Sequence, residues 1–257
     1  CAIQGLSRRR NGTDGRPWGA EFLLADRAEF ERLAHFSYFP LPGGESAIRD
    51  VWKIGIALLH ARYGDDYPIM NRGGEASMVC EVIEKKINCP ETCSIGRIFD
   101  GVAAILGIAK SVSAEAEAAM LLEEAALRGA ETWIDDGWVI PVSAGFPAVI
   151  STESLVERVV TLRLSGRSVE ETACAFHAAI AGIAVAMAEN IRGKDGLNDV
   201  VLSGGAFQNR FLLRLIIDGL REKRFDIHLP EKIPFNDGCL ALGQIAVARE
   251  IIQHEKR

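Results

Sequence analysis

Residues 199–213 read Asp199-Val-Val-Leu-Ser-Gly-Gly-Ala-Phe-Gln-Asn-Arg-Phe-Leu-Leu213. A short apolar run ends at Ser203, Gly204 and Gly205, and an amphipathic helical pattern follows, so the segment predicts a strand, a tight turn and a helix. Adjacent glycines let the backbone approach a ligand, and a helix start presents free N–H groups and a partial positive charge. A phosphate or a nucleotide fits such a turn, and a plain strand–turn–helix connection uses the same glycines.

The C-terminal part alternates strand and helix patterns, which is typical of an α/β layer. We expect strands at 199–203 and 225–229, with helices at about 207–223 and 237–253. Upstream, residues 1–40 favour β structure with loops. The other expected elements are helices over 45–129, the first capped by Ser46, strands over 133–149, a helix over 152–164, and a helix from a Ser168–Glu171 capping box to about Asn190. We therefore expect one domain over residues 1–257, in which a helix-rich part, 1–190, and a nucleotide-loop βαβα part, 191–257, are candidate lobes.

Composition excludes several classes of protein. Of 257 residues, 48% are apolar and 25% are charged, the balance of a soluble globular protein. The net charge of -6 argues against a nucleic-acid-binding surface, and we find no apolar run that is long enough to span a bilayer. The six cysteines are scattered, which favours reduced thiols in a cytoplasmic protein over a disulfide framework. Cys89 and Cys93 have a spacing that suits either a zinc site or simple packing. Because the first residue is Cys1, we expect a piece of a longer polypeptide.

Polar side chains at the ends of the expected elements are the chemical candidates. Asn209, at the helix start, suits either a ligand phosphate or sugar, or a helix cap. Asp237 begins the last helix, where an acid either complements the helix dipole or binds a divalent ion. Asp100 lies in an otherwise apolar helix, so it is paired with Arg97, exposed, or directed at a ligand. The glycine-rich stretch 12–21 suits phosphate and metal chemistry or a β-hairpin loop. The five histidines are well separated and form no metal-binding motif, and His177 is interpreted as a core residue.

Five segments, in order along the chain, resemble the C-terminal domain of HypF, the carbamoyltransferase family of NiFe-hydrogenase maturation. Together they extend over nearly the whole chain, which makes the resemblance far more specific than any one motif. The segments are Thr13–Ala25, Phe39–Arg49, Ile87–Ala104, Val201–Arg210 and Pro234–Gln244.

The resemblance implies an ASKHA fold, that of actin, sugar kinases and Hsp70: two lobes with mixed sheets flanked by helices, here with an incomplete N-terminal lobe. It implies that the domain transfers a carbamoyl group from carbamoyl-adenylate to the C-terminal cysteine of a HypE-type partner. The carbamoyl-adenylate would be made from ATP elsewhere in the parent protein. Gly204, Gly205 and Asn209 would hold the nucleotide, Asp100 would contact the ribose, and Asp237 would bind a divalent ion (Fe, Zn or Mg). A homodimer stays open. Neither a nucleic acid nor a membrane is an expected partner.

The chain departs from the family pattern at several positions. Gln4-Gly5-Leu6-Ser7 stands where the family has Asp-Gly-Thr-Gly, and Ala116 stands where a glycine contacts the nucleotide. The histidine-rich metal motif of the family is not in this sequence, and Cys89 and Cys93 replace serines. Two other functions therefore stay open: a non-catalytic binding module that docks a maturation partner, and a sugar-kinase-like phosphotransferase on the same fold.

Overall fold

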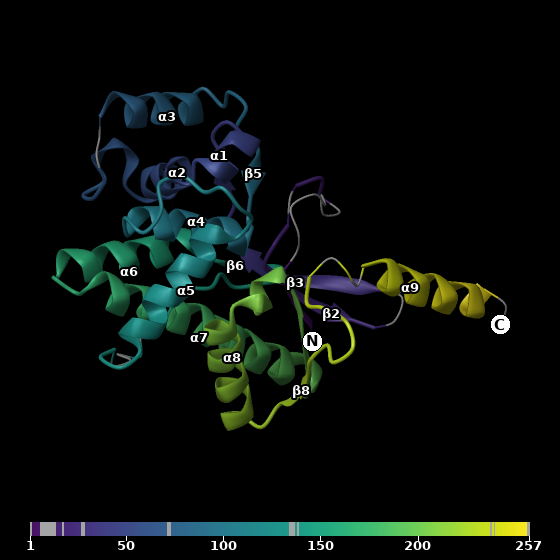
Figure 1. The fold of residues 1–257 in the computed structure, drawn as a ribbon. Helices are drawn as coiled ribbons and strands as arrows, with labels where there is room; N and C mark the ends of the chain where they lie inside the picture. The colour runs from purple at the N-terminus through teal and green to yellow at the C-terminus, as the bar shows by residue number, and fades with distance from the viewer. Residues whose placement is uncertain are drawn as a thin grey trace.

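A six-stranded mixed sheet forms the centre of the molecule (Figure 1). The computed structural model describes residues 2–5, 14–16, 18–26, 29–70, 73–133, 137, 139–236, 238 and 240–255. In the order β6-β3-β2-β1-β7-β8, the first three strands of the chain pair antiparallel, while β6, β7 and β8 pair parallel with their neighbours. The strands are β1 (Ala2–Gly5), β2 (Glu21–Ala25), β3 (Phe30–Phe36), β6 (Ala148–Ile150), β7 (Asp199–Gly204) and β8 (Asp226–His228). The parallel pairing of β1 with β7 brings both predicted parts of the chain into one sheet, while their division into lobes stays a prediction.

Helices make up most of the rest, with α7 and α8 beside the sheet and α2 and α3 at the far end of the molecule (Figure 1). They are α1 (Glu45–Arg49), α2 (Trp52–Tyr63), α3 (Gly74–Glu84), α4 (Ile95–Ile105), α5 (Glu117–Gly129), α6 (Thr152–Leu164), α7 (Val169–Asp195), α8 (Arg210–Glu222) and α9 (Leu240–Glu255). Two short 3₁₀ turns, η1 (Gly64–Asp66) and η2 (Gly205–Gln208), and a two-stranded pairing of β4 (Phe39–Pro40) with β5 (Glu91–Thr92) complete the described elements.

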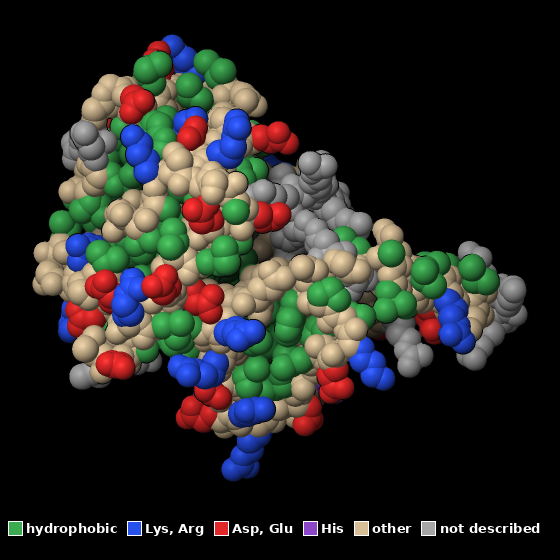
Figure 2. Space-filling view, in the orientation of Figure 1, with side chains coloured by type: hydrophobic (Ala, Val, Ile, Leu, Met, Phe, Trp, Pro, Cys, Tyr) green, Lys and Arg blue, Asp and Glu red, His purple; other side chains and the backbone are tan. Residues whose placement is uncertain are grey.

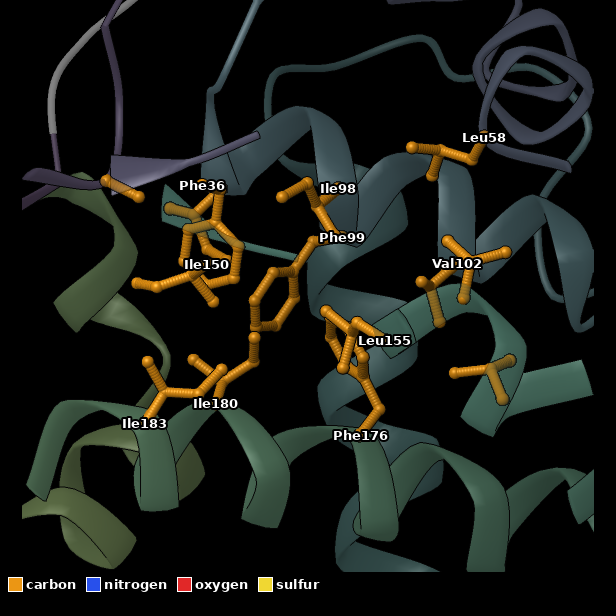
Figure 3. Packing of buried hydrophobic residues seen from close by; sticks show 14 of the residues in the cluster. Phe36, Leu58, Ile98, Phe99, Val102, Ile150, Leu155, Phe176, Ile180 and Ile183 are labelled. Atoms are coloured by element: carbon orange, nitrogen blue, oxygen red, sulfur yellow. The ribbon is translucent and has the colours of Figure 1, made fainter. Parts of the chain in front are cut away.

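The core lies where the sheet meets α4 and α7 (Figure 3). Phe99 of α4 packs edge-on against Phe176 of α7, with ring centroids 4.8 Å apart. Phe36 of β3 and Ile150 of β6 close the cluster from the side of the sheet, and both are almost fully buried. Burying such side chains stabilises the fold by roughly 1.5–3 kcal/mol each, so this cluster fixes α4 and α7 relative to the strands.

The longest helix, α7, begins where the sequence predicts. Ser168 accepts a hydrogen bond from the Glu171 N–H, and the Glu171 carboxylate accepts one from the Ser168 N–H, which is a complete capping box. By length and hydropathy alone α7 could cross a membrane, but 67% of its most apolar window is buried inside the protein. Its apolar surface is therefore used by the core.

Most of the expected elements are confirmed, and two local predictions are wrong. Ser46 does not cap a helix: Gly43 and Gly44, both at positive φ, turn the chain into α1, and the Ser46 hydroxyl accepts a hydrogen bond from Lys53 Nζ at 3.3 Å. Of the described residues between 133 and 149, only the last two lie in a strand, β6. Prolines at 141 and 147 remove ladder donors from this segment, which therefore runs mainly as a loop.

Candidate functional site

Gly204 is the last residue of β7 and Gly205 follows it, and the structure requires glycine at only one of these two positions. Gly204 has a φ of 110° and a ψ of 160°, a region that is open to glycine alone, and its N–H donates to the Phe235 carbonyl at 2.9 Å. Gly205 has no positive φ, and a Cβ atom added there would meet no atom of the described residues within 4 Å. The fold thus requires a glycine at 204, whereas at 205 none of the described residues fills the space that a side chain would take.

Asn209 holds the start of α8 with both ends of its amide. Its Oδ1 accepts a hydrogen bond from the Leu212 N–H at 2.8 Å, and its Nδ2 lies 3.0 Å from His177 Nε2. The capping role that the sequence allowed is therefore present, and the amide is oriented by a histidine from α7. Such an anchored side chain loses little further freedom when it binds a ligand.

His177 is fully buried, and its surroundings determine its protonation state. Nδ1 lies 2.8 Å from the Ala173 carbonyl, which makes Nδ1 the protonated nitrogen and leaves Nε2 to accept from the Asn209 amide. Burial lowers the pKa of His177 to about 4, so the ring is neutral at pH 7. The rings of Phe99 and Phe211 pack against it at 5.1 and 5.5 Å. His177 is thus a core residue that also positions Asn209.

The N–H groups at the start of α8 are already bonded inside the protein. Glu123 of α5 accepts from the Phe211 N–H at 3.0 Å, and Asn209 accepts from Leu212. The expectation that this helix start offers free donors is therefore wrong at these two positions. A ligand near the turn would meet the backbone of η2, at Gly205, before it met α8.

Asp100 lies buried in α4 and forms an ion pair with Arg97, whose Nη1 is 2.5 Å from Asp100 Oδ2. This is the i,i+3 pairing that the sequence allowed. The preceding residue, Phe99, packs on His177, which in turn bonds to Asn209. Through these contacts α4, α7 and the start of α8 are joined, so two of the predicted nucleotide residues belong to neighbouring elements.

Asp237, the predicted metal ligand, lies outside the described residues. The segment just before it is held at the glycine turn, because Phe235 accepts the Gly204 N–H and its ring lies 6.2 Å from that of Phe207. Asn236 follows directly and accepts a hydrogen bond from the Gly238 N–H at 3.1 Å. The structure thus brings Phe235, the residue before Asn236, beside Gly204.

The acids of the stretch from 12 to 21 are engaged by the protein itself. Glu21 is fully buried and is ion-paired with Arg32 of β3. Asp14 accepts hydrogen bonds from Tyr38 Oη at 2.7 Å and from Trp18 Nε1 at 2.8 Å. Residues 11–13 lie outside the described residues. The stretch joins β1 to β2, which pair antiparallel, and its described acids bond to side chains of the protein itself; this favours the hairpin-loop interpretation over phosphate or metal chemistry.

Cys89 and Cys93 have different partners. Cys93 is buried, its thiol lies 3.3 Å from Glu21 Oε1, and burial raises its pKa to about 12. Cys89 Sγ is 3.6 Å from the Val82 carbonyl. Among the described residues, the pair joins no third group that could complete a zinc site, so packing is its role here.

Sequence reasoning missed the residues that support the site, namely His177, Glu123 and Arg32. Each is separated by at least 11 positions from the residue it holds, as with Arg32 and Glu21. No local motif encodes such pairs. The one signal in the sequence was a histidine inside an apolar helix, which is costly to bury unless it is hydrogen-bonded.

Comparison with known proteins identifies the family. Residues 11–244 match the family described as "Carbamoyltransferase, Kae1-like Domain, second subdomain". The "Carbamoyltransferase HypF homolog" of Cupriavidus necator is 33% identical over 244 residues, which are 92% of this chain and 62% of that protein. The HypF carbamoyltransferase of Rhizobium leguminosarum bv. viciae is 32% identical over 95% of this chain and 31% of its own length.

Two solved structures share the fold. Full-length HypF in a phosphate- and nucleotide-bound form superposes with a TM-score of 0.85 at 33% identity, over 98% of this chain and 33% of that one. HypF of T. kodakarensis gives 0.83 at 27% identity, over 98% of this chain and 34% of that one. The chain thus spans from about one third to 62% of the relatives it matches. The predicted ASKHA-type fold is confirmed, and the chain belongs to the HypF carbamoyltransferase family as its Kae1-like domain.

Proposed function

We propose that this chain binds an adenylate at the turn from Gly204 to Asn209 and supports the transfer of its carbamoyl group to a cysteine thiolate of a HypE-type partner. The observation that carries the proposal is Gly205. Neither its φ angle nor its packing against the described residues requires glycine, so among these residues a side chain there would have no neighbour to obstruct. It would obstruct a phosphate that approaches the backbone, and one HypF neighbour was solved with phosphate and nucleotide bound.

Each residue around the turn would contact a different part of the adenylate. The backbone of η2 would meet the phosphate, while Asn209, held by His177, would bind an oxygen of the phosphate or ribose. Asp100 would accept a hydrogen bond from a ribose hydroxyl and would keep its ion pair with Arg97. A carbamoyl-adenylate supplies an activated carbonyl: the thiolate sulfur bonds to the carbonyl carbon, the bond from that carbon to the phosphate oxygen breaks, and AMP leaves. We propose Asp237 as a ligand of a divalent ion beside this turn.

Isothermal titration calorimetry with ATP and with a stable carbamoyl-adenylate analogue tests the binding step. We expect Gly205→Ala to fold normally and to bind at least about tenfold more weakly, because the added methyl group occupies the space of the phosphate. Gly193→Ala in α7 is the matched control, since a Cβ there also meets no described atom within 4 Å. Equal binding by the Gly205→Ala variant and the wild type would remove the basis of this assignment.

A non-catalytic binding module is the second candidate. It is favoured by Ala116, which occupies an αL conformation at the start of α5 where the family has a nucleotide-contacting glycine. Incubation with a HypE-type protein, carbamoyl-adenylate and the chain separates the two functions. Co-purification of the two proteins without carbamoylation of the partner's thiol would support the binding module. Either function would be carried out in the cytoplasm. ATP turnover that depends on an added sugar would instead indicate the phosphotransferase.

A further inference from the structure

Three side chains with metal-binding atoms meet at the far end of the molecule, where α2 and α3 lie in Figure 1. His60 is in the last turn of α2, Asp65 is in η1, and Cys80 is in the middle of α3. One ligand atom from each lies within 4.8 Å of the others. We call these three residues the α2–α3 cluster. It is separate from the glycine turn, which lies beside α8 (Figure 1).

The imidazole of His60 has a buried nitrogen that the protein leaves unsatisfied. Its Nδ1 has no hydrogen-bond partner among the described residues, although Asp65 Oδ1 is only 3.3 Å away. Leaving a buried polar atom without a partner costs about 1–3 kcal/mol. A neutral imidazole offers a lone pair at such a nitrogen, and a cation beside the carboxylate would use it.

The donor set favours zinc. Nitrogen, thiolate sulfur and carboxylate oxygen are the three ligand types that Zn²⁺ takes in proteins, at about 2.0–2.3 Å from the ion. Tetrahedral bonds of that length place ligand atoms roughly 3.5 Å apart, and His60 and Asp65 already approach this spacing. Asp65 is 72% exposed, so its rotamer can adjust, while His60 and Cys80 are held by their helices.

We propose that His60, Asp65 and Cys80 form a zinc site that ties α3 to α2, with the fourth position open to water. The tie is useful at this place because α3 buries only three of its own side chains, Ala76, Val79 and Cys80. The Cys80 thiol carries a proton before the metal arrives, since burial raises its pKa. Zinc binding forms the Zn–S bond and releases that proton to solvent. This site does not rest on the proposed carbamoyl transfer.

Competition with a chromophoric chelator measures zinc binding by the purified, chelator-treated chain, and Co²⁺ serves as the spectroscopic probe. We expect one equivalent of zinc to depend on Cys80, and a thiolate-to-cobalt charge-transfer band that disappears in Cys80→Ala and weakens in His60→Ala. Loss of either ligand should weaken zinc binding at least ~100-fold. Zinc should also raise the melting temperature of the wild type but not that of these variants.

Two control variants identify the site. Cys89→Ser and Cys174→Ser each remove one cysteine outside the cluster, and both variants should bind zinc at this site like the wild type. Asp65→Asn, at an exposed position, should fold and lose at least about tenfold in affinity while it keeps the cobalt band. The proposal is overturned if the wild type shows no such band, if the band survives Cys80→Ala, or if Asp65→Asn binds zinc as tightly as the wild type.

Discussion

The backbone of Ala116 is strained because it adopts a left-handed conformation just before α5. It has a φ of 60° and a ψ of 10° at the start of α5, a left-handed conformation that costs an L side chain roughly 1–2 kcal/mol. The chain keeps this conformation because Glu117 accepts hydrogen bonds from the N–H groups of Ser113 and Ala114, which bend the backbone into the helix.

Replacing Ala116 by glycine should therefore stabilise the protein by about 0.5–1 kcal/mol, the strain relieved less the added entropy of the unfolded chain. Urea unfolding followed by circular dichroism measures the change. Ala114→Gly is the matched control, because Ala114 is not at positive φ and should lose a few tenths of a kcal/mol instead. A destabilised Ala116→Gly variant would contradict this account of α5.

His177 makes stability depend on pH. Its pKa is about 4 in the folded protein and about 6.5 in an unfolded chain, because burial disfavours the charged ring. The unfolded state therefore binds a proton first as the pH falls. The penalty is absent above pH 6.5, grows by about 1.4 kcal/mol per pH unit below it, and reaches about 3 kcal/mol near pH 4.

Unfolding free energies at several pH values, compared with those of His177→Gln, isolate this contribution. The difference between the two profiles should shrink by about 3 kcal/mol from pH 6.5 to pH 4. Parallel profiles for His177→Gln would mean that the ring does not stay neutral in the core.

At the scale of elements, one ion pair locks the β2–β3 hairpin. Glu21 is fully buried on β2 and its partner Arg32 is 12% exposed on β3, where its guanidinium also lies 4.1 Å from the Trp18 ring. A buried carboxylate without a partner is costly, so the pair determines how the hairpin packs more than how stable it is.

Arg32→Met should destabilise the protein by about 3–5 kcal/mol, because it leaves Glu21 buried and unpaired. Arg62→Met is the matched control: Arg62 pairs with Glu157 between α2 and α6, but both side chains are substantially exposed, and its loss should cost far less stability than the loss of Arg32. Adding Glu21→Gln to Arg32→Met should restore part of the stability. If urea unfolding shows the same loss of unfolding free energy for the two arginine variants, the buried pair contributes no more to stability than the exposed one.

The whole molecule exposes an apolar helix. α9 projects from the body in Figure 1, and green apolar side chains lie along it in Figure 2. Leu242, Ile245, Ile251 and Ile252 are between 43% and 66% exposed. Apolar residues gathered on one projecting element mark an association surface. A homodimer, left open by the sequence, is one use of it.

We expect the isolated chain to self-associate through α9 and Ile245→Glu to reduce this without weakening the fold, since Ile245 buries little. Unfolding free energy should change by no more than about 0.5 kcal/mol. Sedimentation velocity over a range of concentrations measures association. Gln253→Glu adds the same charge at an exposed position of α9 and is the control, expected to associate like the wild type. If Ile245→Glu associates as strongly as Gln253→Glu and the wild type, α9 is not the surface involved.

Local signals were sufficient to predict many of these elements. The Ser168–Glu171 capping box, the 152–164 helix and the strand–turn–helix after residue 199 each depend on residues within a few positions of one another. Hydrogen bonds of caps and turns form over such short distances whatever the rest of the chain does, so their patterns can be read directly. Ser46 failed because the glycines before it determine the turn.

Contacts between distant residues were settled by packing alone. Asn209 with His177 and Glu21 with Arg32 are separated by 32 and 11 positions, and His60 meets Cys80 only because α2 and α3 pack together. No periodicity encodes these pairs, since each depends on how whole elements bury their apolar faces. The sequence therefore named the turn and its glycines, while the assembled core decided which glycine faces open space and which side chains hold Asn209.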